Sequence, residues 1–95
     1  MRIFWTGPAL FDLAALHAYI LGRNERAADA VVDSIVARAE RQLSRLPESG
    51  RPGRIANTRE LVLSGTPYIL PYRIVGDTIQ ILRVFHSARR WPDAL

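Results

Sequence analysis

Residues 68–86 read YILPYRIVGDTIQILRVFH, and this stretch decides the fold. Two runs rich in Ile, Leu, Val and Tyr flank the pair Gly76-Asp77, which is typical of a two-residue β-hairpin turn. We therefore predict strands over 68–75 and 78–86. Pro71 lies inside the first of them and cannot donate a ladder hydrogen bond, so we expect an unpaired edge position or a bulge there.

The segment before this hairpin also has β character. Residues 59–64 include the apolar run Leu61-Val62-Leu63, and the Ser64-Gly65-Thr66-Pro67 sequence at their end is typical of a turn. Residues 47–58 hold two prolines and two glycines, which indicates a surface loop. The sequence thus predicts a strand over 59–64 that is entered through a loop over 47–58.

In the first half of the chain, apolar residues recur at helical spacing. One stripe consists of Leu13, Leu16 and Ile20, and a second consists of Ala28, Val32, Ile35, Ala39, Leu43 and Leu46. Thr6 and Asn24 stand where the N-caps of two helices are needed. We predict helices over 8–22 and 25–46, joined as a hairpin.

A short β-favouring run, Ile3-Phe4-Trp5, predicts one further strand over residues 2–6. The element order is then β-α-α-β-β-β in a single α+β domain over 1–95. The simplest architecture is a mostly antiparallel four-stranded sheet with the helical hairpin packed on one face and the other face partly open. The tail, residues 87–95, shows no periodicity.

The composition excludes several classes of site. The chain has 95 residues and no cysteine, so disulfides, thiolate zinc sites and cysteine nucleophiles are absent. Its two histidines have no carboxylate cluster around them in the sequence, and we expect no metal and no cofactor. No charge-free stretch approaches the about 20 apolar residues that span a bilayer. We expect no membrane association and a cytoplasmic location.

Charge is distributed unevenly along the chain. All thirteen basic residues are arginine, and the formal net charge is +4. Residues 1–50 carry six arginines and six acids, whereas residues 51–95 carry seven arginines and three acids. A basic half on a small domain predicts a polyanionic partner, such as nucleic acid, a nucleoprotein machine or an acidic protein segment.

One constellation could carry chemistry. It consists of Arg54, Arg59, Arg73, Arg83, His86, Arg89 and Arg90, interleaved with Tyr68, Tyr72 and Trp91. Arginine contacts phosphate bidentately, aromatic rings stack on bases, and histidine moves protons near neutral pH. A metal-free ribonuclease could be assembled from such parts.

Four of these residues also have a purely structural interpretation. His86 could be a strand-end histidine hydrogen-bonded to backbone. Tyr68 and Tyr72 lie on the same face of a strand and could simply pack there. Arg83 could form a salt bridge with Glu60 or Asp77.

Three segments resemble the RelE/ParE superfamily of bacterial type II toxins. They are Thr58-Arg59-Glu60-Leu61-Val62, Pro67-Tyr68-Ile69-Leu70-Pro71-Tyr72-Arg73-Ile74 and Ile81-Leu82-Arg83-Val84-Phe85-His86-Ser87-Ala88-Arg89-Arg90-Trp91. The opening strand, the helical hairpin and the Gly-Arg-Pro-Gly-Arg loop fit as well, so the resemblance spans nearly the whole chain. It implies the same β-α-α-β-β-β fold.

The resemblance also implies partners. Members of the superfamily are held inactive by a cognate antitoxin, so we expect a hetero-oligomer that binds operator DNA. ParE-like members poison DNA gyrase, whereas RelE-like members cleave mRNA on the ribosome. The C-terminal block favours a ParE-like toxin that is not an enzyme.

The two targets imply different site residues. For the gyrase toxin, the residues expected to bind target or antitoxin are Arg54, Arg59, Tyr72, Arg73, Arg83, Arg89, Arg90 and Trp91, with no catalytic residue. For the ribosome-dependent endonuclease, the expected catalytic set is His86, Arg83, Arg73 and Arg59.

Overall fold

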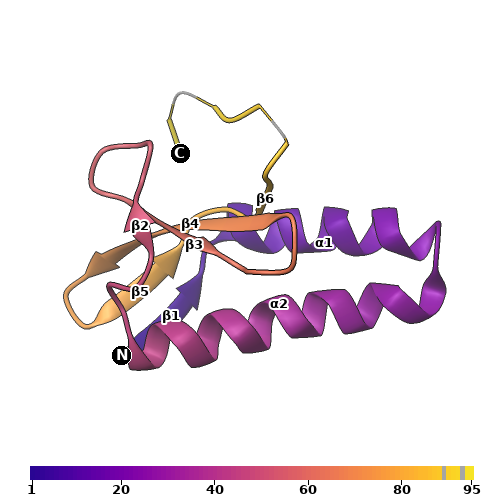
Figure 1. Ribbon diagram of the computed structural model, residues 1–95, viewed down its shortest axis with the longest axis horizontal. Helices are drawn as coiled ribbons and strands as arrows, with labels where there is room; N and C mark the ends of the chain where they lie inside the picture. Colours follow the sequence, from indigo (N-terminus) through magenta and orange to yellow (C-terminus); the bar gives the residue numbers. More distant parts are fainter. Residues whose placement is uncertain (89, 93) are drawn as a thin grey trace.

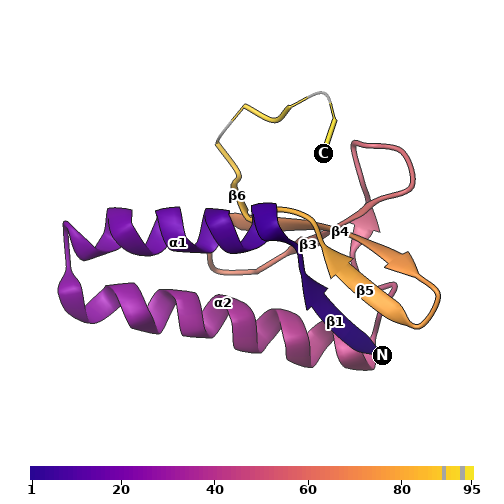
Figure 2. The same ribbon diagram turned by 180° about the vertical axis from the view of Figure 1, so that it is seen from behind.

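A computed structural model describes residues 1–88, 90–92 and 94–95. Two helices run side by side as an antiparallel pair against a sheet, and the C-terminal tail passes over the side of the sheet away from α2 (Figure 1; Figure 2). In chain order the elements are β1 (Arg2–Trp5), α1 (Gly7–Leu21), α2 (Glu25–Arg45), β2 (Arg51–Pro52), β3 (Arg59–Val62), β4 (Tyr68–Val75), β5 (Thr78–Ile81) and β6 (Phe85–His86).

Both helices begin at the predicted caps. The Thr6 side chain accepts a hydrogen bond from the backbone N–H of Ala9, and the Asn24 side chain accepts two from the first turn of α2. The observed bounds differ by one residue or less from the predicted 8–22 and 25–46, because fraying ends are the least determined part of a helix. No helix in the described part of the chain is both long and apolar enough to cross a bilayer.

The sheet is larger than predicted. Its strand order is β1-β5-β4-β3-β2, with β6 beside β4, so it has six strands and not four. β1 is parallel to β5, and the other pairs are antiparallel. The additional strand β2 lies inside the predicted loop 47–58, where Arg51 pairs with Glu60.

The predicted strand over 78–86 is interrupted, which accounts for the other extra strand. Three residues separate Ile81 from Phe85, whereas two separate their partners Tyr72 and Ile69 on β4. This one-residue excess is a bulge opposite Pro71. The backbone of Pro71 faces residues 82–84, since its carbonyl accepts the N–H of Leu82. These residues lie outside the regular ladder, so the missing N–H of Pro71 costs the sheet no ladder hydrogen bond. We predicted an unpaired edge position or a bulge at Pro71 itself, but β4 is a central strand, and the bulge lies in the partner segment opposite Pro71.

The core lies between the helices and one face of the sheet. Alternate strand residues point into it, including Leu61 on β3, Leu70 and Tyr72 on β4, and Ile79 and Ile81 on β5. They meet the helix stripe formed by Leu13, Ile35, Ala39 and Leu43. Full burial of each large aliphatic side chain stabilises the fold by about 1.5–3 kcal/mol, so this layer holds the hairpin to the sheet.

Candidate functional site

A buried carboxylate on α1 determines the path of the chain between β5 and β6. Asp12 is 7% exposed, and its two oxygens accept hydrogen bonds from Arg83 Nε at 2.7 Å and Nη2 at 2.9 Å. The same carboxylate accepts the backbone N–H of Val84 at 2.9 Å. These bonds hold the bulge, and the hydrogen bond from Arg83 to Asp12 raises the pKa of the guanidinium further.

Arg83 therefore pairs with Asp12, and neither of the expected acids, Glu60 and Asp77, is its partner. Sequence reasoning missed Asp12. The available signal was that Asp12 is the single acidic residue within an otherwise apolar helix. An acid at the margin of an apolar helix face requires a cationic partner, because burial of an unpaired charge is costly.

A second buried carboxylate, Glu60 on β3, organises the predicted loop. Glu60 is 2% exposed and accepts hydrogen bonds from Arg51 Nε at 3.0 Å and from the backbone N–H of Arg54 at 2.8 Å. The Arg54 guanidinium lies 3.6 Å from the same carboxylate. These contacts fasten residues 51–54 to the sheet and produce β2.

The tail packs on the sheet through one aromatic layer. The Trp91 ring lies 4.9 Å from the ring of Phe85, and the Arg54 guanidinium stacks over Trp91 at 3.8 Å. The Trp91 indole N–H is buried, and nothing in residues 1–88, 90–92 and 94–95 accepts a hydrogen bond from it. The sheet face expected to be partly open is thus covered here, and Phe85 is only 1% exposed.

Two further arginines of the tail were predicted to bind target or antitoxin, Arg89 and Arg90. Arg90 is exposed, and the predicted binding residue Arg89 lies outside the described residues.

His86 stands at the N-terminal end of β4, beside Tyr68. The two rings are 6.0 Å apart and nearly perpendicular, and His86 Nδ1 accepts the backbone N–H of Ala88 at 3.1 Å. In the neutral ring this leaves the proton on Nε2. A hollow of about 270 Å³ adjoins the pair and is also lined by Asp12 and Tyr19. Burial, followed by the nearby Tyr19, raises the pKa of Tyr68, so this phenol stays protonated at neutral pH.

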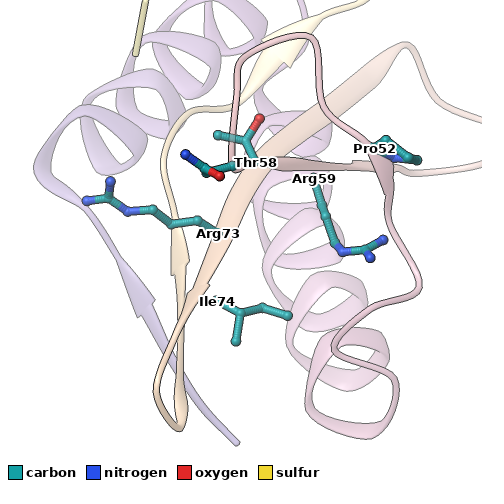
Figure 3. A pocket seen from close by; sticks show the side chains of 6 residues that line it. Pro52, Thr58, Arg59, Arg73 and Ile74 are labelled. Atoms are coloured by element: carbon teal, nitrogen blue, oxygen red, sulfur yellow. The ribbon is translucent and has the colours of Figure 1, made fainter.

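Arg59 and Arg73 line a separate pocket of about 380 Å³, together with Pro52, Asn57, Thr58 and Ile74. Figure 3 shows the two arginine side chains pointing away from each other. Arg59 donates to the backbone carbonyls of Glu48 and Gly50, and Arg73 donates to Gln80 at 2.7 Å. Both arginines keep further N–H groups available.

The predicted catalytic set does not converge on one point. His86 is opposite Tyr68, whereas Arg73 lies five residues further along β4, about 17 Å at the usual rise of a strand. Arg59 is near Arg73, and Arg83 is engaged with Asp12. Arg59 and Arg73 thus line one pocket with their side chains pointing apart, and Arg54 lies against Trp91, but the four predicted catalytic residues do not form a group.

Tyr72 has no access to a partner. It is fully buried, and its hydroxyl donates to the Pro47 carbonyl at 2.7 Å and accepts the Gly50 N–H at 2.9 Å. A Cβ at position 50 would lie 2.5 Å from the ring, so glycine is required there. Burial raises the pKa of Tyr72. Its position supports a role inside the fold, joining the end of α2 to the sheet, and not the binding role expected from the sequence.

Among the described residues, no three His, Asp or Glu side chains are grouped so that they could hold a metal ion. The arrangement offers two arginine-bearing surfaces and one exposed histidine. The arginine side chains can bind anions, and the exposed His86 ring can transfer a proton.

Comparisons with known proteins agree with this fold. Residues 3–91 match the family described as the ParE toxin of the type II toxin-antitoxin system parDE. Y4kP of Sinorhizobium fredii, a candidate toxin by its name, is 49% identical over 94 residues, covering 99% of this chain and 96% of its own. Toxin RelE3 of Caulobacter vibrioides is 40% identical over 93 residues, covering 95% of this chain and 99% of its own.

Among solved structures, a chain from the chromosomal ParDE TA system of P. aeruginosa superposes with a TM-score of 0.83 at 30% identity. The match covers 90% of this chain and 95% of that chain. Together with the fold, these matches define the toxin component of a type II toxin–antitoxin system. The chain belongs to the ParE toxin family, within the RelE/ParE superfamily. Membership of this family implies a cognate antitoxin.

Proposed function

We propose that this protein stops growth by poisoning DNA gyrase in the cytoplasm, as ParE-like toxins do, and that it performs no chemistry of its own. The observation that carries the proposal is the separation of His86 from Arg59 and Arg73 along β4. General acid–base catalysis of phosphodiester cleavage needs these groups within hydrogen-bonding reach of one phosphate. A protein that binds a target and traps it has no such requirement.

The antitoxin is proposed to cover the outer face of α1. Five exposed apolar residues form one stripe there, namely Leu10, Phe11, Ala14, Ala18 and Leu21. Phe11 is 72% exposed, the most of any large hydrophobic residue described. A continuous apolar stripe on an exposed helix is typical of a protein interface. We propose that toxin and antitoxin form a hetero-oligomer through it and that this complex binds operator DNA.

Target contacts are proposed at the surface-accessible members of the arginine set. Arg73 and Arg90 are exposed, and the Arg54 side chain is 48% exposed beside Trp91. Arg83 and Tyr72 are omitted, because their polar groups are used inside the fold.

A second candidate function is ribosome-dependent mRNA cleavage. Two relatives are named as RelE toxins, which favours this function. They are Toxin RelE3, described above, and Toxin RelE2 of Caulobacter vibrioides, which is 34% identical over 88 residues. In this reading the exposed His86 moves the proton and the arginines stabilise the phosphate. This alternative requires Arg59, Arg73 and His86 to come within hydrogen-bonding distance of the same phosphate when RNA is bound.

The test is a supercoiling and DNA-cleavage assay with purified gyrase, ATP and plasmid, run with and without the protein. We expect linear DNA to accumulate after a denaturing quench, because a poison traps the cleaved complex. The same protein is added to programmed ribosomes, where we expect intact mRNA. Intact plasmid together with cleaved mRNA would overturn the gyrase proposal in favour of the endonuclease.

A further inference from the structure

One end of the molecule gathers segments that are distant in sequence. The C-terminal end of α2, the N-terminus and the β4–β5 turn lie together there in both views (Figure 1; Figure 2). Three hollows adjoin one another across this end. The first lies along α2 and shares Arg45 and Leu46 with the second, which in turn shares Ile74 with the pocket of Arg59 and Arg73. We call this continuous surface the basic end.

The basic end is strongly cationic. Five arginines line its hollows, Arg38, Arg41, Arg45, Arg59 and Arg73, and the one acidic residue that lines them is Glu48. The side chains that line the hollows therefore carry a formal charge of +4, equal to the formal net charge of the whole chain. Such an imbalance on one end of a small domain attracts a polyanion.

The arginines on α2 are arranged in a row. Arg38, Arg41 and Arg45 follow the i, i+3, i+7 spacing that places residues on one helix face, over about 10 Å of axis. Arg38 donates to the Ser64 carbonyl at 2.9 Å. The guanidinium groups of Arg41 and Arg45 have no hydrogen-bond or ion-pair partner within the described part of the chain. Their full donor capacity is therefore available to a ligand.

The hollows contain no aromatic side chain among their lining residues. Proteins that bind single-stranded nucleic acid use aromatic rings as stacking platforms for the bases. A row of arginines without such rings suits phosphates whose bases are already stacked. We propose that the basic end binds the phosphate backbone of double-stranded DNA, without reading its sequence.

This inference is independent of the gyrase proposal, because it concerns contact between the toxin chain itself and a duplex. It assigns a role to Arg38, Arg41 and Arg45. These arginines belong to residues 1–50, where six acids balance six arginines in the sequence. An acidic protein segment is the competing polyanion, and the experiment separates it from DNA.

The test measures fluorescence anisotropy of a labelled duplex of about 20 base pairs, titrated with the full chain between about 50 and 200 mM salt. The test variant is Arg41→Gln/Arg45→Gln. The matched control is Arg23→Gln/Arg26→Gln, which makes the same charge change at the opposite end of the helical hairpin. Since each phosphate contact contributes about 0.9 to the slope of log K against log salt, the test variant should lower the slope by about 1.8.

The control variant should keep the wild-type slope and affinity. A wild-type chain that does not bind the duplex at the lowest salt overturns the proposal, as do equal slopes for the two double variants. Poly-glutamate of matched charge and a single-stranded RNA of matched length serve as competitors. If either one displaces the duplex at equal charge concentration, the basic end is not a DNA surface. Circular dichroism of both variants confirms that they are folded.

Discussion

Asp12 and Arg83 are 71 residues apart in sequence and form a two-bond ion pair, with Nε and Nη2 at 2.7 and 2.9 Å from the carboxylate oxygens. The pair joins α1 to the bulge between β5 and β6. The Asp12 side chain is 5% exposed and that of Arg83 is 25% exposed. Because a buried acid left without its cation is costly, this pair should be a main support of the fold.

Asp12→Asn is expected to lower the free energy of unfolding by about 3 kcal/mol, the lower end of the range for breaking a buried pair. The lower end applies because Arg83 keeps some contact with water. Urea denaturation followed by circular dichroism measures the effect. Asp29→Asn serves as the control, since the Asp29 side chain is 84% exposed and its pair with His17 should contribute less than about 1 kcal/mol. Equal losses for the two variants would contradict the role given to Asp12.

Tyr72 predicts a loss of stability at alkaline pH. Burial raises the pKa of Tyr72 in the fold above its ordinary value of 10.0. Above pH 10 the unfolded chain releases the phenol proton first and binds fewer protons than the folded chain, so the free energy of unfolding falls. This contribution is fully present below pH 10 and is lost as the pH rises through the folded pKa.

Tyr72→Phe should remove part of this alkaline loss while lowering stability at pH 7 by about 1–3 kcal/mol, because the Gly50 N–H loses its acceptor. Denaturation curves at neutral and alkaline pH measure both effects. Tyr19→Phe is the control. Because Tyr19 is 61% exposed, this substitution should change neither the stability at pH 7 nor the alkaline loss. An alkaline loss of the same size in Tyr72→Phe and the wild type would refute the assignment.

Arg54→Ala should loosen the tail. The Arg54 guanidinium covers Trp91, and a cation–π contact of this kind is worth about 0.5–2 kcal/mol. In a Trp5→Phe background, Trp91 is the single remaining tryptophan, and acrylamide quenching of its fluorescence should increase. Arg51→Ala is the control, because Arg51 also binds Glu60 but has no ring contact with Trp91. If the control raises quenching as much, Glu60 and not the stack holds the tail.

Phe11→Glu should weaken antitoxin binding by about 30-fold or more, the effect of losing a hot spot of about 2 kcal/mol. The charge would lie in the middle of the apolar stripe on α1. Titration calorimetry with the purified cognate antitoxin measures the change. Val75→Glu places the same charge on an exposed residue of β4 and should change affinity little. An unaffected Phe11→Glu complex would move the interface away from α1.

His86→Ala should leave gyrase poisoning unchanged, because under the proposed function His86 has a structural role, in which its ring contacts Tyr68 and accepts the backbone N–H of Ala88. Growth arrest and gyrase-dependent DNA cleavage are the measurements. Under the endonuclease alternative, the same variant would lower single-turnover mRNA cleavage by about 10²–10⁴, the usual contribution of a general acid or base. His17→Ala is the control in both assays, since His17 pairs with Asp29 on the helical hairpin.

Local patterns predicted most of the elements. Thr6 and Asn24 cap their helices because their side chains reach backbone N–H groups only three residues away or nearer. The pair Gly76-Asp77 makes the predicted turn because glycine readily adopts the positive φ of 61° found there. Gly22, which ends α1, has a φ of −67° in the right-handed region, and the chain turns directly into α2.

The candidate site was less predictable from the sequence. The arginines were recognisable as a set, but Arg83 is bound by Asp12, 71 residues away, and Arg54 lies over Trp91. The apolar helix around Asp12 indicates that this acid needs a cation, but no local signal identifies Arg83 as that cation or places Arg54 on Trp91, because each contact depends on where a helix or a loop meets the sheet. The helical spacing of Arg38, Arg41 and Arg45 is present in the sequence. Its place beside the pocket of Arg59 and Arg73 is known only from the tertiary structure.

The amino-acid order by itself thus determined the helical hairpin, the β4–β5 hairpin, the family resemblance and the excess of arginine. Those features depend on periodicity, capping and turn chemistry within a few residues. Tertiary structure alone decided the parallel pairing of β1 with β5, the bulge held by Asp12, the burial of Tyr72 and the gathering of five arginines at one end. Such features depend on contacts between distant segments, which form only where burial and charge pairing offset the entropy lost on bringing those segments together.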